Sequence, residues 1–128
     1  MKFAYTILYV NDVVQSVAFY KKAFGVTQRF IDETHQYAEI ETGETTLAFA
    51  CNDLAQSNLP EGFQRNSLSA PPAGMEIGFV TEDVAAAFSR AVEAGAIALT
   101  APKVKPWGQT VAYVRDQDGI LVELCSPM

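Results

Sequence analysis

The chain matches itself at an offset of 71 residues, and this internal similarity constrains the fold more than any other feature. The stretch from Tyr5, YTILYVNDVVQSVAFYKKAFG, aligns without a gap with the stretch from Glu76, EIGFVTEDVAAAFSRAVEAGA. Later in each half a second theme recurs, as YAEIETGETTLAFAC and then as VAYVRDQDGILVELC. Because a repeated sequence predicts a repeated structural unit, we expect two modules with equivalent positions.

Hydrophobic periodicity predicts the elements of the first half. Residues 3–10 alternate and are rich in β-branched and aromatic side chains, which is typical of a strand. Asp12 is a plausible helix N-cap, and apolar residues recur at helical spacing from there to Gly25, which ends the helix. Further strands are expected at residues 26–32, 37–42 and 45–51.

The periodic pattern stops between residues 52 and 74, where Asn, Ser, Pro and Gly are frequent, so a surface linker is expected there. The second half is expected to contain a strand at 75–80, a helix at 82–94 capped by Thr81, and strands near 96–100, 109–115 and 120–125. The prediction is one α+β domain, residues 1–128, made of two βαβββ modules, 1–51 and 75–128. Because each helix covers one sheet face, pairing the modules should form a curved sheet around a cavity.

Composition and charge limit the classes of function. Apolar residues make up 49% of the chain and charged residues 19%, which argues against disorder. The net charge is −6, and scattered Lys and Arg argue against a nucleic-acid partner. The sequence shows no signal peptide and no bilayer-spanning apolar run, so we expect a cytoplasmic protein without a membrane partner. Cys51 and Cys125 lack metal-type spacing and are expected to be reduced.

These features resemble the vicinal oxygen chelate superfamily, which includes glyoxalase I, bleomycin- and fosfomycin-resistance proteins and extradiol dioxygenases. The resemblance covers nearly the whole chain. It rests on the opening stretch from Tyr5, the closing VAYVRDQDGILVELCSP and the KPWGQ that precedes it. It implies the double βαβββ fold and a homodimer, but no single activity, because this scaffold carries lyases, transferases, dioxygenases and binding proteins.

In the metal-dependent members of the superfamily, four inner-strand positions supply His, Gln or Glu ligands to a divalent ion. The resemblance places these positions at Tyr5, at about Ala48, at Glu76 and at Glu123. Two carboxylates without an imidazole fall short of the three protein ligands of a tight catalytic site. The one histidine, His35, lies in a predicted turn away from these positions. We therefore expect no metal site and no cofactor.

The candidate ligand-binding residues are Tyr5, Tyr9, Glu76, Trp107, Tyr113 and Glu123. If the two glutamates face one cavity, like-charge repulsion should raise one pKa and leave a proton donor or a cation site. Alternatively, Glu123 reaches solvent at an edge, or its burial is offset by a hydrogen bond to a backbone NH or a tyrosine. Trp107, on a Pro- and Gly-bounded loop, either stacks on a flat or cationic ligand or fills the end of the core or a dimer contact.

The favoured function is metal-independent binding of a small molecule, antibiotic-like or cationic and aromatic, in the manner of bleomycin-resistance proteins. The alternative is a glyoxalase-like lyase, isomerase or dioxygenase with an atypical site that uses Glu76 and Glu123. Only this alternative calls for a divalent metal. A third hypothesis is a regulatory module or subunit whose cavity is vestigial, so the sequence leaves open whether the chain is an enzyme.

Overall fold

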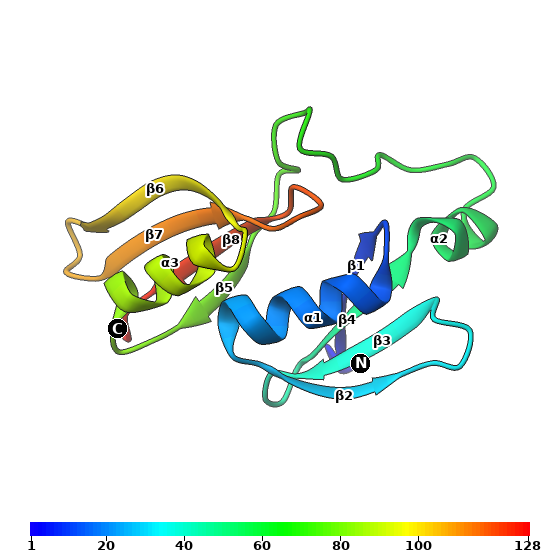
Figure 1. Ribbon diagram of the computed structural model, residues 1–128, viewed down its shortest axis with the longest axis horizontal. Coiled ribbons are helices and arrows are strands. Elements are labelled where there is room, and N and C mark those ends of the chain that lie inside the picture. The colour runs from blue at the N-terminus through cyan, green and yellow to red at the C-terminus, as the bar shows by residue number, and fades with distance from the viewer. The chain divides into compact units, whose positions relative to one another are not determined.

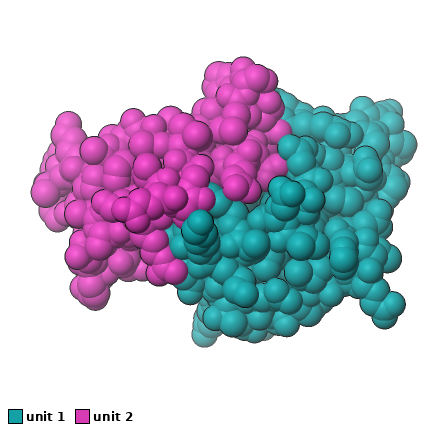
Figure 2. All heavy atoms as spheres, viewed as in Figure 1, with its two compact units in different colours: residues 1–65 teal, residues 66–128 magenta.

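Each half of the chain forms a four-stranded mixed sheet with a helix against it (Figure 1). The computed structural model describes residues 1–128, and the chain divides into two units, Met1–Arg65 (unit 1) and Asn66–Met128 (unit 2), shown in Figure 2. The predicted α+β fold with two βαβββ modules is confirmed. None of the helices combines the length and the apolar character that crossing a membrane requires.

Unit 1 has the strand order β1-β4-β3-β2, in which β1 and β4 are parallel and the other neighbours are antiparallel. Its elements are β1 (Tyr5–Val10), α1 (Val13–Phe24), β2 (Thr27–Ile31), β3 (Tyr37–Glu41), β4 (Thr46–Cys51) and α2 (Asn52–Asn58). The helix α1 begins after Asp12, whose side chain accepts a hydrogen bond from the Gln15 amide at 3.0 Å. It ends at Gly25, whose φ of 69° is left-handed and favours glycine.

The core of unit 1 lies between α1 and one face of its sheet. Tyr20 of α1 and Phe49 of β4 are 1% and 0% exposed, and their rings meet edge to face with centroids 4.8 Å apart. Burying such a side chain stabilises the fold by about 1.5–3 kcal/mol. Because strand side chains alternate, the positions next to Phe49 along β4, among them Ala48, belong to the opposite face.

Unit 2 repeats this arrangement, with the strand order β5-β8-β7-β6 and a parallel β5–β8 pair. Its elements are β5 (Ile77–Val80), α3 (Val84–Glu93), β6 (Ile97–Val104), β7 (Thr110–Arg115) and β8 (Leu121–Cys125). Val84 and Ala91 of α3 are buried, as are Val122 and Leu124 of β8, so the apolar core again lies on one sheet face.

Beyond shifts of a few residues at element ends, the elements differ from the sequence prediction in three places. The expected linker 52–74 contains α2, which is too short to show a helical period of its own in the sequence. The cap of α3 is Asp83, whose carboxylate accepts from the Ala86 amide at 2.9 Å, whereas Thr81 was expected there. The strand β6 runs to Val104, through Pro102, because an edge strand tolerates a residue without an amide hydrogen.

Candidate functional site

The two glutamates singled out by the sequence lie on one face of the unit 2 sheet. The parallel pairing of β5 and β8 sets Gly78 opposite Glu123. Glu76 directly precedes β5 rather than lying inside the expected strand, and it is two residues from Gly78, so it projects to the same side. The residues next to Glu123 along β8, Val122 and Leu124, are 0% and 2% exposed in the core on the opposite side.

The carboxyl groups of Glu76 and Glu123 interact directly. The hydrogen bond with Glu123, assisted by partial burial and the Glu123 charge, raises the pKa of Glu76 to about 7. The pKa of Glu123 is lowered, first by the same hydrogen bond with Glu76. These opposite shifts mean that, above the lowered pKa of Glu123 and below about pH 7, the pair holds one proton, which resides mainly on Glu76 and is donated to Glu123.

Three further groups surround Glu123. Tyr113, opposite Glu123 on β7, donates its hydroxyl hydrogen to Oε2 of Glu123 at 3.3 Å. Hydrogen bonds from the Cys125 thiol and the Tyr113 hydroxyl and the charge of Lys105 all contribute to the lowered pKa of Glu123. Burial, followed by the Glu123 charge, raises the pKa of Tyr113, so its hydroxyl stays protonated as a donor. The Glu123 carboxylate is therefore well supplied with donors, whereas Glu76 is exposed.

Trp107 occupies the turn between β6 and β7. Its indole Nε1 donates to Oε1 of Gln109 at 2.9 Å, and the Gln109 side chain donates in turn to the Ser126 carbonyl at 2.8 Å. The indole is 61% exposed and makes no hydrogen bond to the carboxyl pair. The structure thus presents Trp107 on the surface of unit 2, and its contact with a ligand stays a prediction.

Tyr5 and Tyr9 belong to β1 in unit 1. Strand alternation puts both on the sheet face opposite α1, where Tyr5 pairs with Thr46 and Tyr9 with Ala50. Tyr5 is 53% exposed, and Tyr9 packs against Phe63 with ring centroids 5.0 Å apart. Their predicted proximity to the glutamates of unit 2 stays a prediction.

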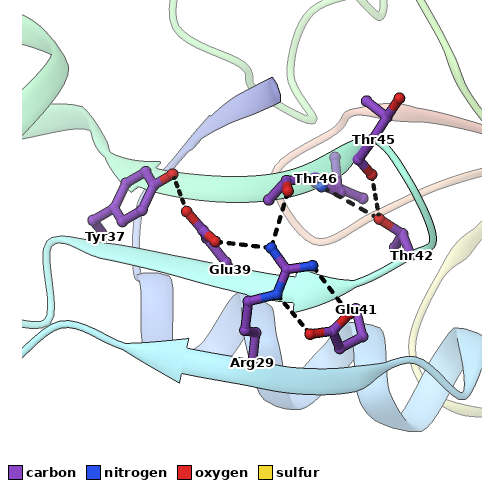
Figure 3. Close-up of polar contacts among 8 residues, drawn as sticks. Arg29, Tyr37, Glu39, Glu41, Thr42, Thr45 and Thr46 are labelled. Carbon is purple, nitrogen blue, oxygen red and sulfur yellow. Dashed lines mark hydrogen bonds and ion pairs between the residues drawn. The ribbon is translucent and has the colours of Figure 1, made fainter. Parts of the chain in front are cut away.

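The same face of unit 1 carries a polar cluster that the sequence analysis missed (Figure 3). Arg29 of β2 donates to both carboxylate oxygens of Glu41, at 2.6 and 3.0 Å. Its Nη1 also donates to Oε1 of Glu39 at 3.0 Å and to Oγ1 of Thr46 at 2.9 Å. The Tyr37 hydroxyl donates to the other Glu39 oxygen at 2.9 Å, and burial followed by this bond raises the pKa of Tyr37 to about 12.

The sequence held one signal for this cluster, the alternation of Tyr37, Glu39 and Glu41 along β3, which puts three polar side chains on one face. The partner Arg29 was not predictable, because it lies where the β2–β3 register shifts between Gln28 and Phe30. Only the register shift in β2 shows that Arg29 lies on the same face as Tyr37, Glu39, Glu41 and Thr46.

Neither unit gathers three or more His, Cys, Asp or Glu side chains in a group that could hold a metal ion. The donor set therefore does not fit the divalent ion of the metal-dependent superfamily members. The groups of the Glu76–Glu123 pair can instead accept hydrogen bonds, donate one proton and attract a cation.

The comparisons with known proteins agree with one another on a single family. The chain matches the family model of the glyoxalase-like domain over residues 3–128. It is 30% identical, over 128 residues, to YraH, an uncharacterized protein of Bacillus subtilis (strain 168), with 97% of each chain covered.

Solved structures agree on the fold. The chain is similar to a glyoxalase-related enzyme from Fulvimarina pelagi, with a TM-score of 0.84, 22% identity, and 99% of this chain and 88% of that chain covered. It is also similar to a glyoxalase/bleomycin resistance protein/dioxygenase family enzyme from Burkholderia phytofirmans PsJN, with a TM-score of 0.79, 18% identity and both chains fully covered, at 100%. At such identities the likeness concerns the fold alone.

Proposed function

We propose that this chain, which belongs to the glyoxalase-like family of the vicinal oxygen chelate superfamily, binds a small organic molecule through Glu76 and Glu123 without a metal ion. The observation that carries the proposal is the direct contact of these two carboxyl groups on a sheet face that the core does not use. A pair of like charges is unfavourable in a structural role, because repulsion and partial burial both oppose its ionisation. Binding of a ligand that offsets this repulsion would account for two carboxyl groups in contact.

The chemistry of the pair favours a ligand with N–H donors, above all an organic cation. The Glu123 carboxylate is already hydrogen-bonded by Tyr113, so the exposed Glu76 is the group that offers acceptor oxygens to a partner. A cation beside Glu76 would also relieve the repulsion that Glu123 exerts on its ionised form. Val80, which alternation places on the same face and which is 66% exposed, provides apolar surface for the body of such a ligand.

The remaining candidate residues extend this proposal. Tyr5, Tyr9 and Trp107 are proposed to contribute aromatic contacts, since aromatic faces attract both flat and cationic groups. The favoured role is sequestration of an antibiotic-like molecule in the cytoplasm by a homodimer, as the family resemblance suggests. The strands at the sheet edges, β1, β2, β5 and β6, are the proposed sites of subunit pairing.

The test is a thermal-shift screen with alkyl and aryl amines, amidines and matched neutral amides, followed by calorimetry on the hits. The double substitution Glu76→Gln/Glu123→Gln should weaken binding of the cationic hits at least tenfold, which corresponds to about 1.4 kcal/mol. The control is Glu93→Gln, which removes a negative charge at the exposed end of α3, distant in sequence from both Glu76 and Glu123. Unchanged affinity in the double variant would sink the proposal.

One observation favours a second function, acid–base catalysis of the lyase or isomerase type. A pKa of about 7 at Glu76 lets this group both take and release a proton near neutral pH, which is what general acid–base catalysis needs. Activity on hemithioacetal substrates in metal-free buffer, lost in Glu76→Gln and retained in Glu93→Gln, would support this function over simple binding. No turnover with any such substrate would leave binding as the role of the pair.

A further inference from the structure

The segment that follows β4, residues 52–65, is named the strap. It begins with α2 and contains a buried polar atom without a hydrogen-bond partner, Oδ1 of Asn52. The Asn52 side chain is 4% exposed, and its Nδ2 donates to Oδ1 of Asn11 at 2.8 Å. An unpaired buried carbonyl oxygen destabilises the state that buries it, because water would bind this oxygen in any state that exposes it.

Apart from local hydrogen bonds, little apolar burial stabilises the strap. The helix α2 has seven residues, fewer than an isolated helix needs to be stable in water. Its N-cap is the thiol of Cys51, which accepts from the Leu54 amide at 3.5 Å, and sulfur is a weak acceptor. Within the strap, Asn52 and Ala55 are the buried residues, so Ala55, at 1% exposure, is its one fully buried apolar side chain.

The far end of the strap lies on an aromatic contact. Phe63 meets Tyr9 of β1 edge to face, with ring centroids 5.0 Å apart and planes at 69°. The Arg65 guanidinium stands over the Phe63 ring at 5.8 Å. Tyr9 and Tyr37 both pair with Ala50 of β4 and share the sheet face opposite α1, so the Phe63 ring covers part of that face.

We propose that the strap is a lid that opens as one piece, lifting Phe63 from Tyr9 and hydrating Asn52 while the sheet and α1 stay folded. Segments with few buried apolar contacts are those that open locally in folded proteins. Opening exposes the Tyr9 ring and the neighbouring part of the sheet face. The lid thus controls access to the aromatic surface of unit 1 that includes Tyr9.

The test is hydrogen–deuterium exchange with mass spectrometry on the full chain. In the parent protein, peptides covering residues 53–59 should exchange at least tenfold faster than peptides covering β3 and β4. Asn52→Leu replaces the orphaned amide with an apolar side chain of similar size, so it should slow exchange in the strap about fivefold. The Asn11 amide that loses its donor is exposed and can bind water instead.

Phe63→Ala removes the ring contact and should accelerate exchange in the strap at least threefold without changing β3 and β4. Asn58→Leu makes the same chemical change as Asn52→Leu at an exposed position of α2 and is the matched control. The proposal of a lid is contradicted if residues 53–59 exchange at the same rate as β3 and β4 in the parent protein. It is also overturned if Phe63→Ala accelerates the sheet as much as the strap, or if Asn58→Leu slows the strap as strongly as Asn52→Leu.

Discussion

Ala48 in β4 occupies the position that Glu123 occupies in β8. Ala48 pairs with Ile7 of β1, and Glu123 pairs with Gly78 of β5, the residue that the offset of 71 makes equivalent to Ile7. On the other side, Ala48 faces Glu39 of β3 as Glu123 faces Tyr113 of β7. The two sheets therefore place their carboxylates on different strands, and only unit 2 has a carboxylate at this inner position.

Introducing a carboxylate at position 48 should destabilise unit 1. Ala48 is 0% exposed and lies beside Glu39, so Ala48→Glu buries a second negative charge next to the first. We expect a loss of at least about 2 kcal/mol in the free energy of unfolding, measured by urea denaturation. Ala18→Glu, on the exposed side of α1, is the control and should change stability little, because Lys22 lies four residues on. Equal stability of the two variants would contradict the packing described for Ala48.

Glu76→Gln should change how stability depends on pH. The pKa of Glu76 is about 7 in the folded chain and its ordinary value is 4.5, so between these values the folded state holds a proton that the unfolded state has lost. The free energy of unfolding of the parent protein should therefore fall as the pH rises from about 5 to about 7.5. Relative to Glu76→Gln, this loss should be about 1 kcal/mol, since solvent screens the exposed carboxyl.

The measurement is chemical denaturation of both proteins at four pH values across that window. The lowered pKa of Glu123 affects stability in a different pH range. Its contribution to the free energy of unfolding is present above the ordinary pKa of 4.5 and is lost only at lower pH. Parallel pH profiles for the parent protein and Glu76→Gln would show that the two carboxyl groups do not share a proton.

Arg29→Ala should destabilise unit 1 more than Glu41→Gln does. Arg29 contacts Glu39, whose side chain is 12% exposed, and Glu41, whose side chain is 51% exposed. Removing the guanidinium leaves the nearly buried Glu39 charge without its ion pair, whereas Glu41→Gln leaves that pair intact. We expect a fall of several degrees in the melting temperature for Arg29→Ala and of about a degree for Glu41→Gln, by calorimetry. The reverse order would show that Glu39 does not depend on Arg29.

The sequence predicted what periodicity and equivalent positions can encode. The helical spacing of apolar residues such as Tyr20 located the core face of α1, and the resemblance to the superfamily singled out Glu76 and Glu123 as inner positions. The polar cluster around Arg29 depends on a β-bulge, and a bulge changes which side chains share a face without leaving a pattern in the sequence. The helix α2 was not predicted, because its seven residues span only two turns and show no helical period in the sequence.

Divalent metal ions should leave the melting temperature unchanged. A ligand that binds only the folded state raises stability in proportion to the logarithm of its concentration over its dissociation constant, so a tight metal site is visible in a thermal-shift assay. Glu76 and Glu123 lack a third protein ligand within unit 2, and the equivalent position in unit 1 is Ala48. We expect a shift below about 1 °C with Ni²⁺, Zn²⁺, Mn²⁺ or Fe²⁺ at low millimolar concentration. Stoichiometric metal in the purified protein, lost in Glu76→Ala but kept in Glu93→Ala, would contradict this prediction. It would show that a ligand from outside unit 2 completes a metal site with Glu76.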